Sequence, residues 1–300
     1  MTAPKAKSRT WTILELLRWT TQYFAERGIE TPRLDAECLL ASALGVDRMR
    51  LYLDFDKPAS PDERDAFREW VRRRADERVP VAQLVGGKEF WSLPLLVTAD
   101  VLSPRPDTET LVVAALERLP ERDSDARILE IGTGSGAVAL AIARERPRAK
   151  ITATDVSPAA LKVAERNARE LGLDGRIEFA GGSLFGPVIG RQFEFVVSNP
   201  PYIAESERLE LAPELAHEPD VALFAGPDGL SVLRELVAGA PAFLAPGGGF
   251  AVELAPDQAP TVAHWLREAG LGDVVTHRDL AARPRVVSAR GPRPPESENF

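Results

Sequence analysis

The stretch Arg127-Ile128-Leu129-Glu130-Ile131-Gly132-Thr133-Gly134-Ser135-Gly136 decides the fold of this chain. Its first half is an apolar run that predicts a buried strand, and residues 136–146 have the apolar spacing of a helix. Between them, three glycines at alternate positions let the backbone turn sharply and approach a ligand, because no Cβ stands in the way. The stretch therefore predicts a strand, a ligand-binding loop and a helix of an α/β nucleotide-binding fold.

Strands and helices alternate along the chain from residue 126 onward. We predict strands over residues 127–131, 150–154, 176–180, 193–197, 249–254, 273–276 and 285–289. We predict helices over residues 136–146, 157–171, 230–244 and 259–269. This alternation predicts a mostly parallel sheet that is covered by helices on both faces.

The chain before residue 105 has a different character. Residues 1–80 have apolar side chains at helical spacing and a helix start at Ser60-Pro61, which predicts a small helical domain. Residues 81–104, in which Gly86-Gly87 precedes an aromatic run, predict a β-hairpin connector. The α/β domain then occupies residues 105–290, and the Pro/Glu/Ser-rich residues 291–300 predict a disordered tail.

Composition bounds the possible partners. The 300 residues are 44% hydrophobic and 27% charged, as in a globular protein, and no apolar run is long enough to span a bilayer. A net charge of −8 predicts no stable binding to nucleic acid. The single cysteine, Cys38, fits a reducing cytoplasm, and the three histidines lack the spacing of a metal site.

Asp155 adds a second element of a nucleotide site. It follows the second predicted strand, 19 residues after Gly136, where a carboxylate can accept both hydroxyls of a ribose. NAD(P) is a rival ligand, but its fingerprint spaces the glycines G-x-G-x-x-G, whereas this loop reads G-x-G-x-G. Glu130 suits a cationic amino-acid moiety better than a phosphate. These features favour S-adenosylmethionine, which joins adenosine to an amino acid.

The segment Ser198-Asn199-Pro200-Pro201-Tyr202 follows the predicted strand at 193–197. The Asn199 side-chain carbonyl and the Pro200 backbone carbonyl are two acceptors for a planar NH2 group, and the prolines stiffen the loop. Tyr202 offers a flat face for an amide or a base. We predict that Asn199, Pro200 and Tyr202 are catalytic and turn a bound nitrogen toward an electrophile; the alternative is an ordinary proline turn.

With these residues, the chain resembles the class I S-adenosylmethionine-dependent methyltransferases, and within them the HemK/PrmC family of peptide-chain release factor glutamine methyltransferases. The Asn-Pro-Pro-Tyr segment is shared with DNA adenine and other amino methyltransferases. The segment Pro104-Arg105-Pro106-Asp107-Thr108-Glu109 points to this family in particular. His217-Glu218-Pro219 and Arg278-Asp279-Leu280-Ala281 also match it.

The resemblance implies a Rossmann-like class I methyltransferase sheet and methylation of the glutamine side chain in the GGQ motif of class I release factors. It implies substrate contacts at Asn199, Pro200, Pro201 and Tyr202, and contacts to the cofactor S-adenosylmethionine at Gly132, Thr133, Gly134, Ser135, Gly136, Asp155 and Asn199. Where the family often has an acidic and then an aromatic residue beside the adenine, this chain has Ser183 and Leu184. We therefore expect Leu184 to pack on the adenine.

Other functions stay open at this point. An enzyme of this kind could instead methylate a glutamine of a ribosomal protein or an adenine of nucleic acid, although the acidic charge disfavours nucleic acid. A third possibility is a binding protein that keeps the fold without the chemistry. We expect the helical domain at 1–80 to dock a large protein substrate, but its apolar positions could equally be only core.

Overall fold

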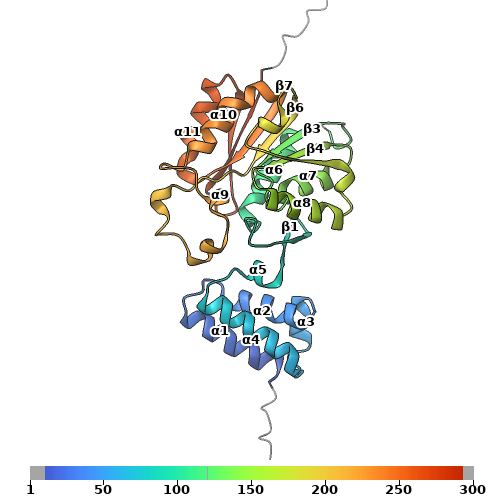
Figure 1. The fold of residues 1–300 in the computed structure, drawn as a ribbon, viewed down its shortest axis with the longest axis vertical. Coiled ribbons are helices and arrows are strands. Elements are labelled where there is room, and N and C mark those ends of the chain that lie inside the picture. The colour runs from blue at the N-terminus through green and yellow to red at the C-terminus, as the bar shows by residue number, and fades with distance from the viewer. Residues whose placement is uncertain (1–10, 120, 293–300) are drawn as a thin grey trace, which may run out of the picture. The chain divides into compact units, whose positions relative to one another are not determined.

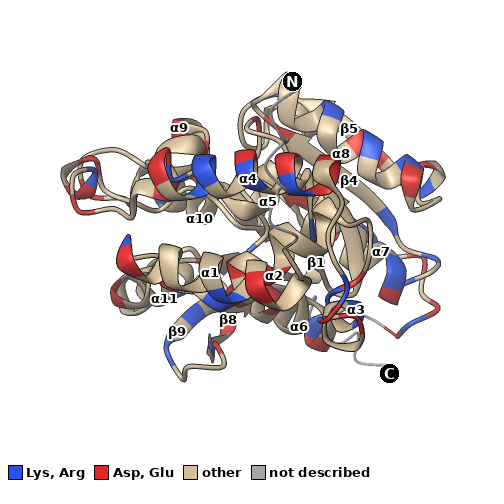
Figure 2. Cartoon of the chain, turned by 90° about the horizontal axis from the view of Figure 1, so that it is seen from below, with Lys and Arg blue, Asp and Glu red and all other residues tan. Residues whose placement is uncertain are grey.

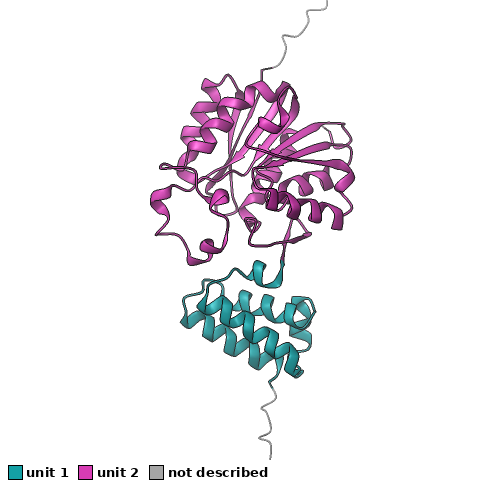
Figure 3. Ribbon diagram, in the orientation of Figure 1, with its two compact units in different colours: residues 1–86 teal, residues 87–300 magenta. Residues whose placement is uncertain are grey.

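Two compact units make up the chain, residues 1–86 and residues 87–300, which Figure 3 shows in different colours. The structure is a computed structural model, and it describes residues 11–119 and 121–292 (Figure 1). The segment 291–300, expected to be a disordered tail, lies outside the described residues apart from 291 and 292. Each unit has a hydrophobic core of its own.

The first unit is helical. Its helices are α1 (Ile13–Glu26), α2 (Pro32–Ala43), α3 (Arg48–Leu53), α4 (Pro61–Asp76) and α5 (Val81–Val85). Capping boxes open α1 at Thr12 and α4 at Ser60, where each hydroxyl accepts the N–H of a glutamate three residues on. The short helix α5, which falls within the segment expected to be a connector, packs against α2 and α4 in this unit.

The second unit begins with a β-hairpin. Strands β1 (Gly87–Phe90) and β2 (Leu93–Leu96) pair antiparallel around Trp91 and Ser92, which both have positive φ, as the tightest hairpin turns require. Asn167, in a later helix of the same unit, accepts the N–H of Leu96 at 2.7 Å and donates to its carbonyl at 3.1 Å. The same amide also donates to the Ser135 carbonyl at 2.8 Å, so one side chain joins the hairpin to the glycine loop.

A seven-stranded sheet forms the body of the second unit. Its strands lie in the order β5-β4-β3-β6-β7-β9-β8, and β9 is antiparallel to both of its neighbours while the other pairs are parallel. Their bounds are β3 (Arg127–Ile131), β4 (Lys150–Asp155), β5 (Ile177–Gly181), β6 (Phe193–Ser198), β7 (Leu244–Glu253), β8 (Gly272–Arg278) and β9 (Pro284–Arg290). The predicted α/β fold with a mostly parallel sheet is confirmed.

Helices cover both faces of this sheet. Alternate strand residues point to opposite faces, so that Ile128 packs with α6 and α7 whereas Leu129 packs with α10 and α11. The main helices are α6 (Glu109–Arg118), α7 (Ala137–Glu145), α8 (Pro158–Glu170), α10 (Ser231–Phe243) and α11 (Ala259–Glu268). Because the chain runs from β3 outward to β4 and β5 and then returns to β6, a crevice is expected at the carboxyl ends of β3, β4 and β6.

Shorter elements complete the unit. Helix α9 (Asp220–Leu223) and six single-turn 3-10 helices lie in the loops of the described residues: η1 (Pro106–Thr108), η2 (Asp174–Arg176), η3 (Gly186–Val188), η4 (Glu205–Glu207), η5 (Pro213–His217) and η6 (Pro256–Gln258). In the part of the chain that the structure describes, no helix is long and apolar enough to cross a membrane.

Acidic and basic side chains alternate along the helices, as α4 and α8 illustrate in Figure 2. Arg72 pairs with Glu69 at 2.8 Å on α4, and Arg166 pairs with Glu170 at 2.8 Å on α8. Exposed pairs of this kind contribute only about 0–1 kcal/mol each to stability. Their consequence for this chain is a mixed surface charge on these helices rather than a basic stripe.

Candidate active site

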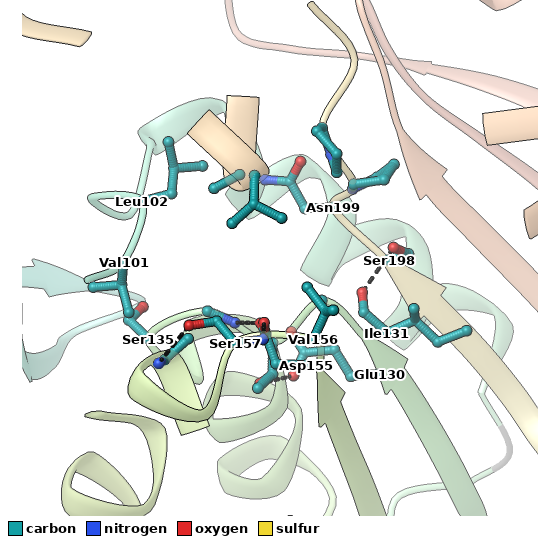
Figure 4. A pocket seen from close by; sticks show the side chains of 18 of the residues that line it. Val101, Leu102, Glu130, Ile131, Ser135, Asp155, Val156, Ser157, Ser198 and Asn199 are labelled. Carbon is teal, nitrogen blue, oxygen red and sulfur yellow. Dashed lines mark hydrogen bonds between the residues drawn. The ribbon is translucent and has the colours of Figure 1, made fainter. Parts of the chain in front are cut away.

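A cavity of about 310 Å³ opens at the carboxyl ends of the central strands (Figure 4). It lies where the order of the parallel strands reverses, which is the position at which open α/β sheets bind ligands. The structure brings most of the predicted site residues together in its lining: Gly132, Thr133, Gly134, Ser135, Asp155, Leu184, Asn199, Pro200 and Pro201. In Figure 4 the cavity separates Asn199 from Ser135 and Asp155.

The glycine loop leaves β3 in a conformation that disfavours other residues. Gly132 and Gly134 have φ of 74° and 55°, and both line the cavity. Gly136 (φ 84°) is not among the lining residues; a Cβ there would lie 3.2 Å from the Cβ of Ala164. Gly136 therefore permits close packing of α7 on α8, whereas the first two glycines bring the backbone to the cavity.

Asp155 ends β4 and holds the glycine loop. Its Oδ2 accepts the N–H of Gly134 and its Oδ1 accepts the N–H of Ser157, both at 2.8 Å. The residue is 9% exposed and lines the cavity. Because each carboxylate oxygen can accept two hydrogen bonds, each retains one lone pair for a ligand hydroxyl.

Glu130 is a buried carboxyl at the entry to the loop. One oxygen, Oε2, accepts the Thr133 hydroxyl at 2.5 Å and the N–H of Ala139 at 3.2 Å, so the residue ties the loop to the first turn of α7. Burial raises the pKa of Glu130 to about 8, although these two hydrogen bonds oppose the shift. Glu130 is therefore protonated over much of the neutral range.

Ser183 and Leu184 line the cavity beyond β5. Leu184 has φ of 48°, which is uncommon for a residue other than glycine, and it packs against the core beside α10. The following residue, Phe185, stacks on Phe243 with ring centroids 4.4 Å apart. This packing holds the loop that presents Leu184.

The Asn-Pro-Pro segment leaves two hydrogen-bond acceptors unpaired at the cavity. Asn199 directly follows β6, and its Nδ2 donates to the Thr108 hydroxyl at 3.2 Å. Among the described residues, no hydrogen bond ends on Asn199 Oδ1 or on the Pro200 carbonyl. Both residues line the cavity, so the two acceptors are available to an NH2 group.

Tyr202 is placed differently from the other three residues of this segment. It is half-buried, packs against the core beside α10 and α11, and is not among the lining residues. Its hydroxyl lies 3.4 Å from Glu253 Oε1, and its carbonyl accepts Gln258 Nε2 at 2.9 Å. Burial raises the pKa of Tyr202 to about 12, which keeps the hydroxyl protonated at neutral pH.

Sequence reasoning assigned no role to several residues that build this site. Arg105 lines the cavity and donates to Glu218 Oε2 at 2.6 Å, while the N–H of Ser103 donates to Glu218 Oε1 at 3.1 Å. Thr108 also lines the cavity, and Glu253 is buried. The Pro104–Glu109 motif contains Arg105 and Thr108 and drew attention to them, but it did not predict their contacts. No group of acidic, His or Cys side chains among the described residues is placed to hold a metal ion.

Two family models match parts of this chain. Residues 15–86 match the model described as PrmC N-terminal domain, and residues 105–229 match the methyltransferase small domain. The release factor glutamine methyltransferase of Geobacter sulfurreducens is 44% identical over 285 residues, which are 95% of this chain and 98% of the relative. The chain belongs to the family of release factor glutamine methyltransferases.

Other members of this family are similarly close. The release factor glutamine methyltransferase of Deinococcus radiodurans is 43% identical over 92% of this chain and 97% of its own length. A solved structure, the release factor-specific protein-(glutamine-N5) methyltransferase of Alicyclobacillus acidocaldarius, is 32% identical over 63% of this chain and 94% of its own, with a TM-score of 0.40. The two family models and the relatives of 43–44% identity confirm the resemblance seen in the sequence.

Proposed function

We propose that this chain transfers a methyl group from S-adenosylmethionine to the side-chain amide nitrogen of the GGQ glutamine in peptide-chain release factors. The observation that carries the proposal is the pair of acceptors left open at the cavity, Asn199 Oδ1 and the Pro200 carbonyl. A primary amide has two N–H groups on one nitrogen, so two acceptors on the same wall of the cavity can each accept one of them. Membership of the release factor glutamine methyltransferase family supports the choice of substrate.

The residues around the glycine loop fit the cofactor. Gly132 and Gly134 would let its amino-acid part approach the backbone, Asp155 would accept the ribose hydroxyls, and Leu184 would pack on the adenine. When bound, S-adenosylmethionine supplies the methyl group: a nitrogen–carbon bond forms as the sulfonium–carbon bond breaks, and S-adenosylhomocysteine is released.

The chain's own contribution is to orient the amide nitrogen. That nitrogen is a poor nucleophile because its lone pair is delocalised into the carbonyl. Asn199 Oδ1 and the Pro200 carbonyl would each accept one N–H, which fixes the nitrogen and stabilises the positive charge that develops on it. Such alignment can supply on the order of 7–11 kcal/mol of the barrier. The nitrogen then releases a proton and becomes a neutral methylamide.

We further propose that the helical unit docks the intact protein substrate and that the α/β unit carries out the chemistry. The family model that covers residues 15–86 supports a role specific to this family. Under this proposal the chain works in the cytoplasm, where release factors end translation, and needs no stable contact with nucleic acid.

The test is methylation with labelled cofactor of three separate candidates: a release factor, a ribosomal protein and DNA. We expect label only in the release factor, on the glutamine of its GGQ motif when the peptide is sequenced by mass spectrometry. A release factor with alanine in place of that glutamine is the control and should stay unlabelled. Labelling of the ribosomal protein or the DNA, with none in the release factor, would overturn the proposal.

A further inference from the structure

Arg105 is the single lysine or arginine among the described residues that line the cavity. Its Nη2 donates to Glu218 Oε2 at 2.6 Å, and the Arg105 side chain is 40% exposed. Neither its Nε nor its Nη1 has a hydrogen bond or an ion pair with any other described residue. Because a guanidinium has five N–H groups, most of the donors of Arg105 are open to a ligand.

The other charged side chains of the lining are acidic: Asp100, Glu130, Asp155 and Glu235. S-adenosylmethionine has one carboxylate, at the end of its amino-acid part, and ionised neighbours of the same sign would repel it. A carboxylate that leaves water is stabilised only if a cation or N–H donors replace the lost hydration. The cofactor therefore needs such a partner within this cavity.

The glycine loop is the first place to look for that partner, since backbone N–H groups at the start of a helix attract anions. Its first three N–H groups are already bound within the protein. Those of Gly132 and Thr133 donate to the Thr154 carbonyl at 2.8 and 2.9 Å, and that of Gly134 donates to Asp155 Oδ2 at 2.8 Å. The first half of the loop therefore has no N–H left for the carboxylate.

Arg105 lies on the side of the cavity where the amino-acid part of the cofactor is expected. The N–H of Thr108 donates to the Arg105 carbonyl at 3.1 Å, and the Thr108 hydroxyl accepts Asn199 Nδ2 at 3.2 Å. A Cβ on Gly132 would lie 3.8 Å from the Asn199 carbonyl oxygen. Short contacts thus link Arg105 to the ends of β6 and β3, whereas Leu184, at the proposed adenine end, follows β5 two strands away from β3.

Glu218 holds the guanidinium of Arg105 in this place. The Glu218 side chain is fully buried, and its second oxygen, Oε1, accepts the N–H of Ser103 at 3.1 Å. The next residue, Pro219, lines the cavity. Two donors from the segment 103–105 thus bind one carboxylate, which fastens this segment to the cavity wall at 218–219. An arginine that is already ordered loses less conformational freedom when a ligand binds to it.

We propose that Arg105 binds the carboxylate of the amino-acid part of S-adenosylmethionine through the N–H groups that Glu218 leaves open, and that Glu218 is the positioning residue that orients this guanidinium. The inference rests on the proposed function, because it takes the cavity as the cofactor site, but it does not depend on which molecule is methylated. It gives Arg105 of the Pro104–Glu109 motif a role in cofactor recognition.

The first test compares two ligands that differ only in the carboxylate, S-adenosylhomocysteine and its decarboxylated form, by calorimetry on the full chain. We expect the wild-type chain to bind S-adenosylhomocysteine about 10- to 150-fold more tightly, the range for hydrogen bonds to a charged group. In Arg105→Met this preference should fall to about 1- to 3-fold, while the affinity for the decarboxylated ligand stays within about 3-fold and shows that the variant is folded. Arg105→Lys, which keeps the charge but not the planar guanidinium, should lie between the two.

The second test concerns Glu218. Glu218→Gln loses the ion pair that holds Arg105, so the preference for the carboxylate should fall at least about 3-fold. In an Arg105→Met background the same substitution should leave the preference unchanged, since no guanidinium remains to be oriented. Arg166→Met is the control: it removes an equal charge from α8 outside the cavity lining, and it should keep the wild-type preference.

The outcomes separate this inference from the proposed function. An unchanged preference in Arg105→Met, or an equal loss of affinity for both ligands, would overturn the role of Arg105, and an unchanged preference in Glu218→Gln would overturn the positioning role. Failure of the wild-type chain to methylate a release factor, with the expected change of preference in Arg105→Met, would overturn the proposed substrate and support the carboxylate site.

Discussion

The nitrogen and the oxygen of the Asn199 side-chain amide have different roles. Its Nδ2 is bound to Thr108, and its Oδ1 has no partner among the described residues. We predict that Asn199→Ala lowers turnover about 10²–10³-fold, the usual effect of removing one fixed transition-state hydrogen bond. Cofactor affinity should change little, because the glycine loop and Asp155 are intact. Single-turnover kinetics and calorimetry measure the two quantities.

Asn199→Asp is the matched control for this prediction. It keeps an acceptor at the same place but replaces the NH2 that Thr108 holds, so it should retain the cofactor and still lose turnover. Normal folding together with near-normal turnover in Asn199→Ala would show that the Asn-Pro-Pro-Tyr loop is structural, and the proposed chemistry would have to be abandoned.

Asp155 is predicted to govern cofactor affinity. Asp155→Ala removes the proposed acceptor of the ribose hydroxyls and also the partner of the Gly134 and Ser157 N–H groups. Hydrogen bonds to a charged group contribute roughly 1.5–3 kcal/mol, so the dissociation constant for S-adenosylhomocysteine should rise about 10- to 150-fold. Calorimetry gives this constant, and an unchanged value would remove Asp155 from the site.

Glu130 should make stability depend on pH. Its folded pKa of about 8 lies above the ordinary value of 4.5, so between these values the folded chain holds a proton that the unfolded chain has released. The free energy of unfolding therefore falls as the pH rises from about 5 to about 8. Glu130→Gln should weaken this dependence in urea denaturation. Glu178→Gln is the control, because Arg191 lowers the pKa of Glu178 and leaves it ionised throughout this range.

Among individual residues, the sequence predicted those site residues that lie at the ends of strands. Asp155 and Asn199 were predicted because each lies at the end of a predicted strand, and the cavity includes both. Thr108 could not be assigned in this way, because its bond to Asn199 joins residues 91 positions apart. Glu253 was assigned no role for a related reason. Apolar periodicity predicts that its strand is buried, but it does not predict that the Tyr202 hydroxyl contacts the Glu253 side chain.

Among the elements, the central strands were predicted closely because they are short apolar runs between clear breaks. Strand β3 has the predicted bounds, and β4 and β6 extend them by one residue. Strand β7 begins at Leu244 instead of 249, because Leu244 already pairs with Phe193 of β6; an irregularity follows, and regular pairing resumes at Gly249. The turns and the short helix between 205 and 223 have too few apolar residues to show a period.

Gly229 fixes the position of the substrate loop relative to α10. It has φ of 69°, and a Cβ there would lie 2.5 Å from the Tyr202 carbonyl oxygen. We predict that Gly229→Ala displaces the loop and lowers turnover at least 10-fold, while cofactor affinity is retained, because a ~1 Å misplacement of reacting groups can cost on the order of 10²-fold.

Gly172→Ala is the control for steric crowding. Gly172 has nearly the same φ, 67°, but open space where the Cβ would be. The Gly172→Ala variant should therefore have normal turnover, and backbone strain should lower its free energy of unfolding by about 1 kcal/mol. Equal turnover in the two variants would show that the contact with Tyr202 does not position the loop.

For the whole molecule, the division at residue 86 permits a test of which unit selects the substrate. A chain that begins at Gly87 keeps the complete sheet, the cavity and the hairpin. We predict that it binds S-adenosylhomocysteine like the full chain but loses most methylation of an intact release factor. A short peptide that contains the target glutamine should be methylated by both proteins at similar rates.

Circular dichroism and the cofactor affinity of the shortened chain establish that it is folded before its activity is judged. If the folded α/β unit methylates the intact release factor at the full rate, the helical unit is not needed for docking.

Asn167 also has a consequence for the order in which the chain folds during synthesis. The hydrogen bonds of Leu96 to Asn167 join residues 71 positions apart. At roughly 5–20 residues per second, a ribosome needs about 4–14 s to make this interval. Helices α1 to α5 have been synthesised well before then and can complete their core. During this interval the backbone groups of Leu96 lack their partner, and the hairpin is exposed to aggregation. A chaperone that binds nascent chains would protect it most at this stage.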